Sequence, residues 1–211
     1  MLRRPDAPKF WSVPREWQGE TAFLVGGGPS VLEVDLELLR GRRIIAINSS
    51  YERVPFADFL AFGDLRWFLE HRGPLHQFQG RVVTWRNTPC EIKNANREIL
   101  TLERQLPPGL ATLPTRVVFR RTSFSAAINL AVHLGASTIV MLGLDGKATA
   151  DGRTHHHAPH RWPFRPGCWR DQAAELKTLV EPLKQLGITM RNASPDSALD
   201  LWPRADLKDC L

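Results

Sequence analysis

The sequence predicts an α/β fold: a single Rossmann-like domain with a mainly parallel sheet flanked by helices. Short apolar runs rich in β-branched and aromatic residues alternate with segments of helical periodicity. This alternation is typical of parallel sheets whose strands are buried on both faces. A chain of 211 residues can bury a large core in one compact domain without disulfides or a structural metal.

Seven apolar runs are expected to be strands, because they are short and continuous and contain few charges. They are Thr21–Gly26, Arg43–Asn48, Asp58–Gly63, Arg81–Trp85, Arg116–Phe119, Thr138–Gly143 and Ile188–Arg191. Four segments have the spacing of amphipathic helices. They are Val31–Arg40, Leu65–His71, Ser125–Leu134 and Asp171–Leu186. Gly135 and Gly187 follow the last two helices, where left-handed C-terminal caps are expected.

Two stretches interrupt this alternation, Asn87–Pro114 and Ala148–Gly167, and both are expected to be long loops. Residues 1–20 are expected to form an N-terminal extension. They contain no apolar run of the kind found in secretory signals, and no part of the chain reaches the roughly 18 apolar residues of a membrane helix. A soluble cytoplasmic protein without a membrane partner is therefore expected.

The cysteines and the charge add two further expectations. Cys90, Cys168 and Cys210 show no CxxC spacing, which disfavours a disulfide framework and a zinc ribbon. The 28 basic and 22 acidic side chains give a formal net charge of +6. This charge favours anionic partners such as nucleotides, phosphosugars or nucleic acid, without choosing among them.

A glycine-rich loop follows the first predicted strand and consists of Gly26, Gly27, Gly28, Pro29 and Ser30. Glycines permit positive φ angles and close approach of a ligand, and free N–H groups at a helix start favour an anion. Ser30 and Glu33 match a capping box at the start of the next helix. The loop is predicted to hold a phosphate, and a tight turn without a ligand is the alternative. The motif is neither a P-loop nor a complete dinucleotide fingerprint.

Asn48 ends the second predicted strand, where an NAD enzyme carries Asp or Glu for the ribose. Its amide can donate and accept hydrogen bonds, which suits recognition of a base, a ribose or a phosphate. A role as a strand cap is the alternative.

Hydroxyl and carboxylate groups lie at three further element ends. Thr122, Ser123 and Ser125 stand at the start of a helix, where they either cap it or bind a nucleotide. Asp145 follows a strand whose carboxyl end faces the ligand crevice of such sheets. It is the main catalytic candidate, expected to hold Mg²⁺ beside phosphates or to orient a sugar hydroxyl. Asp64 occupies a similar strand end and either binds the nucleotide or caps the following helix.

Six sequence motifs together resemble one protein family. They are GGGPS at Gly26–Ser30, Asn48, FGD at Phe62–Asp64, TSFSAAINLAVHLGA at Thr122–Ala136, TIVMLGLD at Thr138–Asp145 and NASPDSAL at Asn192–Leu199. The chain resembles MptE-like (6-hydroxymethylpterin diphosphokinase-like) proteins encoded by phages and prophages, over nearly its whole length. It is distantly similar to the bacterial sialyltransferases of family 42.

The resemblance implies nucleotide-phosphate binding. In the sialyltransferases a GNGPS loop, an Asn after the next strand and a TSG segment hold a cytidine nucleotide. The counterparts here are Gly26–Ser30, Asn48 and Thr122–Ser123, with Gly27 in place of Asn and Phe124 in place of Gly. The MptE-like relatives transfer diphosphate from ATP to a pterin with Mg²⁺, so the two families share nucleotide binding and differ in the reaction.

Four histidines, His155, His156, His157 and His160, crowd the second predicted loop, 148–167. In an extended chain His155 and His157 would share a side. Metal ligation, a solvated loop, and general-base or phosphate contact all remain open. The sialyltransferases place a catalytic His after the corresponding strand, which makes His157 and His160 the candidates for a general base. The aromatic residues nearby, Trp162, Phe164 and Trp169, either pack the loop onto the core or stack a base.

These observations predict a transferase that binds a nucleotide sugar or nucleoside phosphate at the glycine loop. It would transfer a glycosyl or phosphoryl group to an acceptor such as phage DNA or a glycan, in the cytoplasm of a bacterial host. One alternative is a non-enzymatic phage morphogenesis or DNA-associated protein on the same scaffold. Another is a pterin diphosphokinase-like enzyme.

Overall fold

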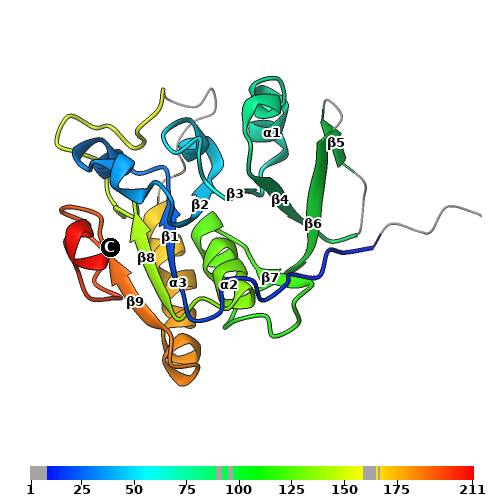
Figure 1. Ribbon diagram of the computed structural model, residues 1–211. Helices are drawn as coiled ribbons and strands as arrows, with labels where there is room; N and C mark the ends of the chain where they lie inside the picture. Colours follow the sequence, from blue (N-terminus) through cyan, green and yellow to red (C-terminus); the bar gives the residue numbers. More distant parts are fainter. Residues whose placement is uncertain (1–8, 89–91, 95–96, 159–164, 166) are drawn as a thin grey trace, which may run out of the picture.

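The computed structural model describes residues 9–88, 92–94, 97–158, 165 and 167–211. Within these residues nine strands form one sheet in the order β5-β6-β4-β3-β2-β1-β8-β9, with β7 also beside β6 (Figure 1). Every described strand pair is parallel except β5 with β6. The α/β fold with a mainly parallel sheet is therefore confirmed.

The strands are β1 Thr21–Val25, β2 Arg43–Ile47, β3 Phe59–Phe62, β4 Arg81–Arg86, β5 Ile92–Asn94, β6 Arg97–Gln105, β7 Arg116–Val118, β8 Thr138–Leu142 and β9 Thr189–Asn192. The α-helices are α1 Leu65–His71, α2 Ser123–Leu134 and α3 Cys168–Gln185. Short 3-10 helices complete the described elements: η1 Pro29–Glu33, η2 Leu36–Leu39, η3 Asn48–Glu52, η4 Pro74–Gln77 and η5 Leu207–Cys210. No helix of the described chain combines the length and the apolarity needed to cross a bilayer.

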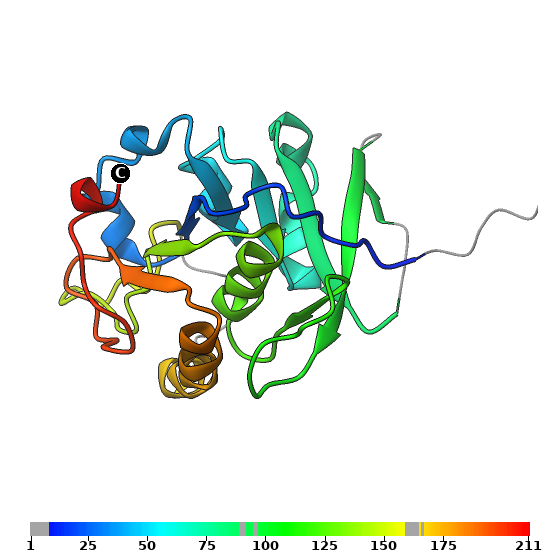
Figure 2. The same cartoon turned by 60° about the horizontal axis from the view of Figure 1, so that its bottom comes forward.

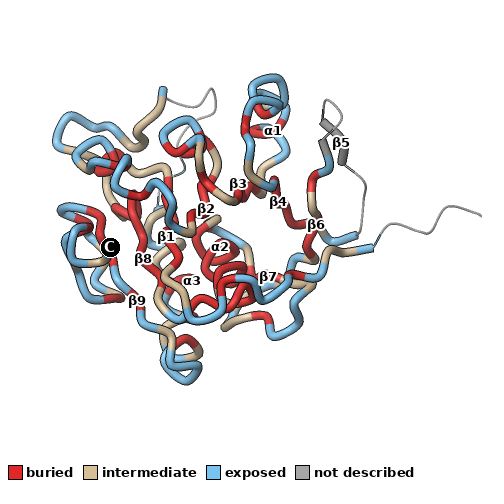
Figure 3. Tube along the Cα trace, viewed as in Figure 1, coloured by how far each residue is buried: buried red, intermediate tan, exposed pale blue. Residues whose placement is uncertain are grey.

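The two faces of the sheet are covered by different elements. Helices α2 and α3 lie together on one face, and residues of η1, η2, η3, α1 and η4 pack on the other (Figure 2). Strand β1 shows the alternation, because Ala22 and Leu24 join the first core cluster while Phe23 and Val25 join the second. Buried positions follow the central strands and α2 (Figure 3). Continuous apolar runs are thus explained by burial on both faces.

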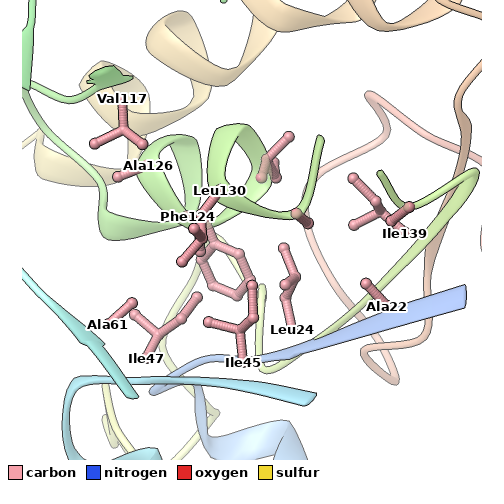
Figure 4. Packing of buried hydrophobic residues seen from close by; sticks show 14 of the residues in the cluster. Ala22, Leu24, Ile45, Ile47, Ala61, Val117, Phe124, Ala126, Leu130 and Ile139 are labelled. Carbon is pink, nitrogen blue, oxygen red and sulfur yellow. The ribbon is translucent and has the colours of Figure 1, made fainter. Parts of the chain in front are cut away.

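Phe124 links the core to the carboxyl ends of the strands. Its ring lies among Leu24, Ile45 and Ile47 beneath α2 (Figure 4). The same side chain closes the bottom of the pocket described below. The first turn of α2 is therefore anchored in the core, which fixes its position relative to β1 and β2.

All seven predicted strands are present, with shifts of at most one residue at their ends. The predicted helices at α1, α2 and α3 are present as well. Gly135 and Gly187 follow α2 and α3 with φ angles of 99° and 70°, as expected for left-handed caps.

Two predictions of local structure were wrong. Val31–Arg40 is not one helix, because Val34 is extended between η1 and η2 and Asp35 starts the second by accepting a bond from Glu37 N. Asn87–Pro114 is not only a loop, because it contains β5 and the nine-residue β6. Strand β6 has only a short apolar middle, residues 99–102, with a charged pair on each side, so it lacks the longer apolar run that marked most of the other strands.

The described part of the N-terminal segment, residues 9–20, lies against the domain. Trp17 is 2% exposed and packs edge-on against Phe59, with ring centroids 5.4 Å apart. The backbone N–H of Trp17 donates to the backbone O of Leu134 at 2.7 Å. This segment therefore contributes to the core beneath α2.

Candidate ligand-binding site

A pocket opens at the carboxyl ends of β1, β2, β3 and β8, with a cavity volume of about 240 Å³. From β1 the chain builds the sheet outward through β2, β3 and β4, and it then returns to place β8 on the other side of β1. The pocket thus lies at the point where the strand order reverses, which is the usual ligand site of open α/β sheets. The histidine segment lies on the same side of the molecule as these strand ends (Figure 1).

Most of the predicted site residues meet in this pocket, although they are far apart in sequence. Those that line it are Gly27, Gly28, Asn48, Asp64, Thr122, Ser123, Asp145 and His157. Gly26, Pro29, Ser30 and Ser125 do not line it and have roles in packing or in hydrogen bonding within the fold. His160 lies outside the described residues.

The glycine loop is shaped by its own protein neighbours. None of Gly26, Gly27 and Gly28 has a positive φ, which corrects the expectation of left-handed backbone in the loop. A Cβ on Gly26 would lie 2.3 Å from the Phe124 ring, and one on Gly28 would lie 2.6 Å from the Asp145 carboxylate. A Cβ on Gly27 would lie only at contact distance from His155, at 3.4 Å. Gly27 is therefore the glycine that faces the pocket with space beside it.

Asp145 clamps the glycine loop to the end of β8. Its Oδ2 accepts from Ser30 N at 2.9 Å and its Oδ1 accepts from Ser30 Oγ at 2.5 Å. The capping box was thus predicted wrongly, since η1 has Gly28 as its N-cap and the Ser30 hydroxyl bonds Asp145 instead. Burial raises the pKa of Asp145, and the two bonds from Ser30 oppose that rise. Asp145 is only 8% exposed but still reaches the pocket wall.

The described residues contain no group of three or more His, Cys, Asp and Glu side chains placed to hold a metal ion. Asp145 uses both carboxylate oxygens on Ser30. Mg²⁺ usually keeps several waters and binds nucleotides through one or two carboxylates plus phosphate oxygens, so such a site needs no complete protein cage. The assignment of Mg²⁺ to Asp145 stays a prediction.

Asn48 has the most unusual environment among the predicted residues. Its φ of 51° is left-handed, a conformation that Asn tolerates better than most residues. Its side chain lines the pocket, and its buried Oδ1 has no hydrogen-bond partner among the described residues. A buried acceptor without a donor costs about 1–3 kcal/mol. The proposed role as a strand cap is not supported, since Ile47 is the N-cap of η3 and Asn48 is its first residue.

The three hydroxyl residues at the start of α2 have different roles. Thr122 Oγ1 accepts from Phe124 N at 3.2 Å, which makes Thr122 the N-cap, although it also lines the pocket. Ser125 is completely buried and donates to Thr122 O at 2.7 Å and to Glu175. Ser125 therefore belongs to the fold, and Ser123 is the hydroxyl that the helix start offers to the pocket. Asp64 caps α1 by accepting from Arg66 N at 2.7 Å, as one alternative predicted, and it also lines the pocket, where nucleotide binding stays a prediction.

The histidine segment closes one side of the pocket. His155 and His157 both line it, as expected for an extended chain, with ring centroids 4.9 Å apart. His156 points elsewhere: its N–H donates to Gly27 O at 2.9 Å, and its Nε2 lies 3.3 Å from Ser50 Oγ. Burial, followed by the positive neighbours His157 and Arg53, lowers the pKa of His156 to about 4. A neutral His156 thus ties this segment to the glycine loop and to η3.

Several pocket residues were not predicted from sequence. Arg121 and Lys147 bring positive charge to the pocket, and Ser49 and Trp67 contribute to its wall. Arg121 and Ser49 are direct neighbours of predicted residues, and Lys147 lies two residues after Asp145. A search that also considered the residues within two positions of each predicted site residue would therefore have found these three. Trp67 gave no signal beyond its aromatic character. Trp169, for which the sequence left packing or base stacking open, does line the pocket.

Comparison with known proteins gave no match to a family model, to a curated protein or to a solved structure. The resemblance to MptE-like proteins and to sialyltransferases consequently stays a prediction from the motifs.

Proposed function

We propose that the protein is a transferase whose pocket binds a nucleotide or nucleotide sugar and which passes a glycosyl or phosphoryl group to an acceptor. The observation that carries the proposal is the buried Asn48 Oδ1, which has no hydrogen-bond partner among the described residues and belongs to a pocket that the start of α2 also lines. Asn48 Oδ1 can accept a hydrogen bond from a ligand hydroxyl or N–H group, and the N-terminus of α2 favours an anion. A ligand that carries both such a donor and a phosphate fits this combination.

The phosphate end of the ligand would lie at the start of α2. The first N–H groups of a helix carry partial positive charge, and the 12 residues of α2 make a full-length dipole. The side chains of Arg121 and Lys147 add positive charge at the pocket wall. Across from them, the Gly27 N–H has no acceptor among the described residues. These groups together favour a phosphate over a neutral ligand.

The nucleoside end would contact Asn48. Its Oδ1 would accept from a ribose hydroxyl or from a base N–H, which would remove the cost of the unpaired acceptor. Asp145 would orient a sugar hydroxyl or, with phosphates bound, help to hold Mg²⁺. His157 faces the same space and would act as general base or phosphate contact. The acceptor would be a glycan, a nucleic acid or a small molecule.

Isothermal calorimetry tests the proposal with CMP, UDP, GDP and ATP, each with and without Mg²⁺. We expect at least one of them to bind, and Gly27→Asp to abolish binding because its carboxylate would repel the phosphate. The fold should persist, since the new Cβ meets only ordinary contact with His155. Gly73→Asp is the matched control, because Gly73 has a φ of −67° and open space around it, away from the pocket.

Two results would contradict the proposal. One is that no nucleotide in the panel binds. The other is DNA binding with a steep salt dependence and no response to nucleotides, which would favour the non-enzymatic DNA-associated alternative. Turnover of ATP with a hydroxymethylpterin would instead identify the diphosphokinase-like reaction.

A further inference from the structure

Ser49 lies at the wall of the pocket, directly after Asn48, and contacts two side chains of α1. Its Oγ accepts from the Trp67 indole N–H at 2.9 Å and lies 3.4 Å from His71 Nε2. The residue is 2% exposed, and what remains of its surface borders the pocket. Ser49 therefore connects the ligand space to a histidine that does not itself line the pocket.

The direction of these bonds follows from donor and acceptor chemistry. An indole N–H can only donate, so the Trp67 bond uses a lone pair of Ser49 Oγ. With the Ser49 proton pointing at His71 Nε2, that nitrogen is the unprotonated one of a neutral ring. The second nitrogen, Nδ1, then donates to the Tyr51 hydroxyl, 3.1 Å away, and lies 3.6 Å from Glu52 Oε1, at ion-pair distance. The Tyr51 hydroxyl also bonds Glu52, so the network runs from Ser49 through His71 to the carboxylate of Glu52, in part by way of Tyr51.

The packing holds His71 in this orientation. Its ring stacks on Trp67 with centroids 4.5 Å apart and planes 17° from parallel. Burial lowers the pKa of His71, and His157 lowers it further, while the carboxylates of Glu52 and Glu70 oppose the shift. The imidazole is accordingly neutral at neutral pH, which is the state that can take up a proton.

We propose that Ser49, His71 and Glu52 form a serine–histidine–carboxylate relay that removes the proton of an acceptor hydroxyl in this pocket. The inference rests on the proposed transferase function and narrows the acceptor to an alcohol. As the acceptor oxygen attacks the donor, its proton passes to Ser49 Oγ and the Ser49 proton passes to His71 Nε2. The bond to the departing nucleotide breaks, and Glu52 stabilises the imidazolium. His157 is then left to contact phosphate.

The neighbouring serine makes a useful contrast. Ser50 Oγ also lies near a histidine, 3.3 Å from His156 Nε2. Ser50 does not border the pocket, and no carboxylate contributes to the pKa shift of His156. The Ser50–His156 pair therefore serves to tether the histidine segment, whereas the Ser49–His71 pair has both an acid partner and access to a ligand.

A hydroxyl activated in this way also reacts as a nucleophile, so a small dialkyl fluorophosphate tests the relay without knowledge of donor or acceptor. Ser49 Oγ attacks phosphorus, the P–F bond breaks, fluoride leaves and the proton passes to His71. Mass spectrometry of the intact chain and its peptides locates the label. We expect one label at Ser49, formed at a rate that rises with pH to a plateau with a midpoint below 6.5, as the lowered pKa of His71 requires.

Variants separate activation from structure. His71→Gln should slow labelling by about 100-fold or more, the usual contribution of a general base, and Glu52→Gln by about 10-fold. His76→Gln is the matched control, because His76 is an exposed histidine whose own contact is with Gly73 O. It should leave the labelling rate unchanged. Thermal unfolding of each variant checks that it is folded.

Two results would overturn the relay: a wild-type chain that is not labelled at Ser49, or His71→Gln labelled within about threefold of wild type. Its failure can be told apart from failure of the proposed function. Labelling of Ser49 without nucleotide binding would support the relay and contradict the proposed nucleotide-binding function. Nucleotide binding without labelling of Ser49 would support the proposed function and contradict the relay.

Discussion

On one wall of the pocket, the protein's own side chains occupy the space beside two glycines of the glycine loop. On the wall around Asn48, the buried Oδ1 of that residue has no hydrogen-bond partner among the described residues. Gly26 and Gly28 make room for Phe124 and Asp145. Asn48 instead keeps a left-handed backbone and an unpaired Oδ1. The sequence predicts a ligand contact at both walls. The comparison teaches that Gly26 and Gly28 are needed by the fold itself, whereas Gly27 and Asn48 are the residues that we propose for the ligand.

The largest effect is expected at Gly28. A Cβ there would lie 2.6 Å from the Asp145 carboxylate and 2.6 Å from Gly143 O, which is backbone and cannot move away cheaply. Gly28→Ala should lower the free energy of unfolding by about 3 kcal/mol. Denaturant unfolding measures the change. Gly27→Ala is its control and should stay within about 0.5 kcal/mol of wild type, since its Cβ meets only ordinary contact. Equal stability of both variants would refute the division between the walls.

Ser30→Ala should have an intermediate effect. It removes the hydroxyl that donates to Asp145 Oδ1 and leaves a buried carboxylate with one bond fewer. We expect a loss of about 2 kcal/mol in denaturant unfolding. Exposed Ser137→Ala, which removes a bond to Gly19 O, should cost less. A negligible effect of Ser30→Ala would mean that the clamp does not hold the loop.

Asn48→Gly probes the other wall and should separate stability from binding. Glycine adopts the 51° φ without strain and removes the unpaired oxygen. The free energy of unfolding should rise by about 0.5–1 kcal/mol, while nucleotide affinity should fall by about 10-fold. Thermal unfolding and calorimetry on the same samples measure both. A loss of stability would place Asn48 with the fold residues instead.

The smallest effect concerns the tether between the histidine segment and the glycine loop. Burial lowers the pKa of His156 to about 4 in the fold, from the 6.5 that is usual for histidine. As the pH falls from 6.5 to 4, the unfolded chain takes up a proton that folded His156 does not, so stability falls across this window. The loss should be roughly 1–2 kcal/mol after allowance for solvent screening.

His156→Gln, which does not titrate, should reduce this pH dependence. Unfolding measured at pH 4.5 and at pH 7.5 gives the difference for each chain. Identical pH dependence in the two chains would show that His156 is not held neutral by the fold.

The fold was largely predictable because its central strands are buried on both faces and so appear as continuous apolar runs. Strand β6 was not predicted because its apolar middle, residues 99–102, is short and has a charged pair on each side, as a strand near the edge of the sheet allows. The prediction of one helix at Val31–Arg40 was wrong because the spacing of the apolar residues did not reveal that the backbone of Val34 is extended.

The site was predictable only where residues follow strands, since parallel strands bring their carboxyl ends to one edge. This rule located Asn48, Asp64 and Asp145. It could not show that the Ser30 hydroxyl bonds Asp145 and the Ser125 hydroxyl bonds Glu175, because those partners are 115 and 50 residues away in sequence. Nor could it find His71, which does not line the pocket itself and contacts the pocket residues Ser49 and Trp67.

Backbone NMR of the ¹⁵N-labelled chain during titration with the nucleotide panel tests the central claim most directly. If the pocket binds the phosphate between the glycine loop and α2, the amide signals of Gly27, Asn48 and Ser123 should shift most, and Asn48→Gly should weaken the titration. Absence of shifts with every nucleotide, or shifts confined to residues outside the pocket, would contradict the account.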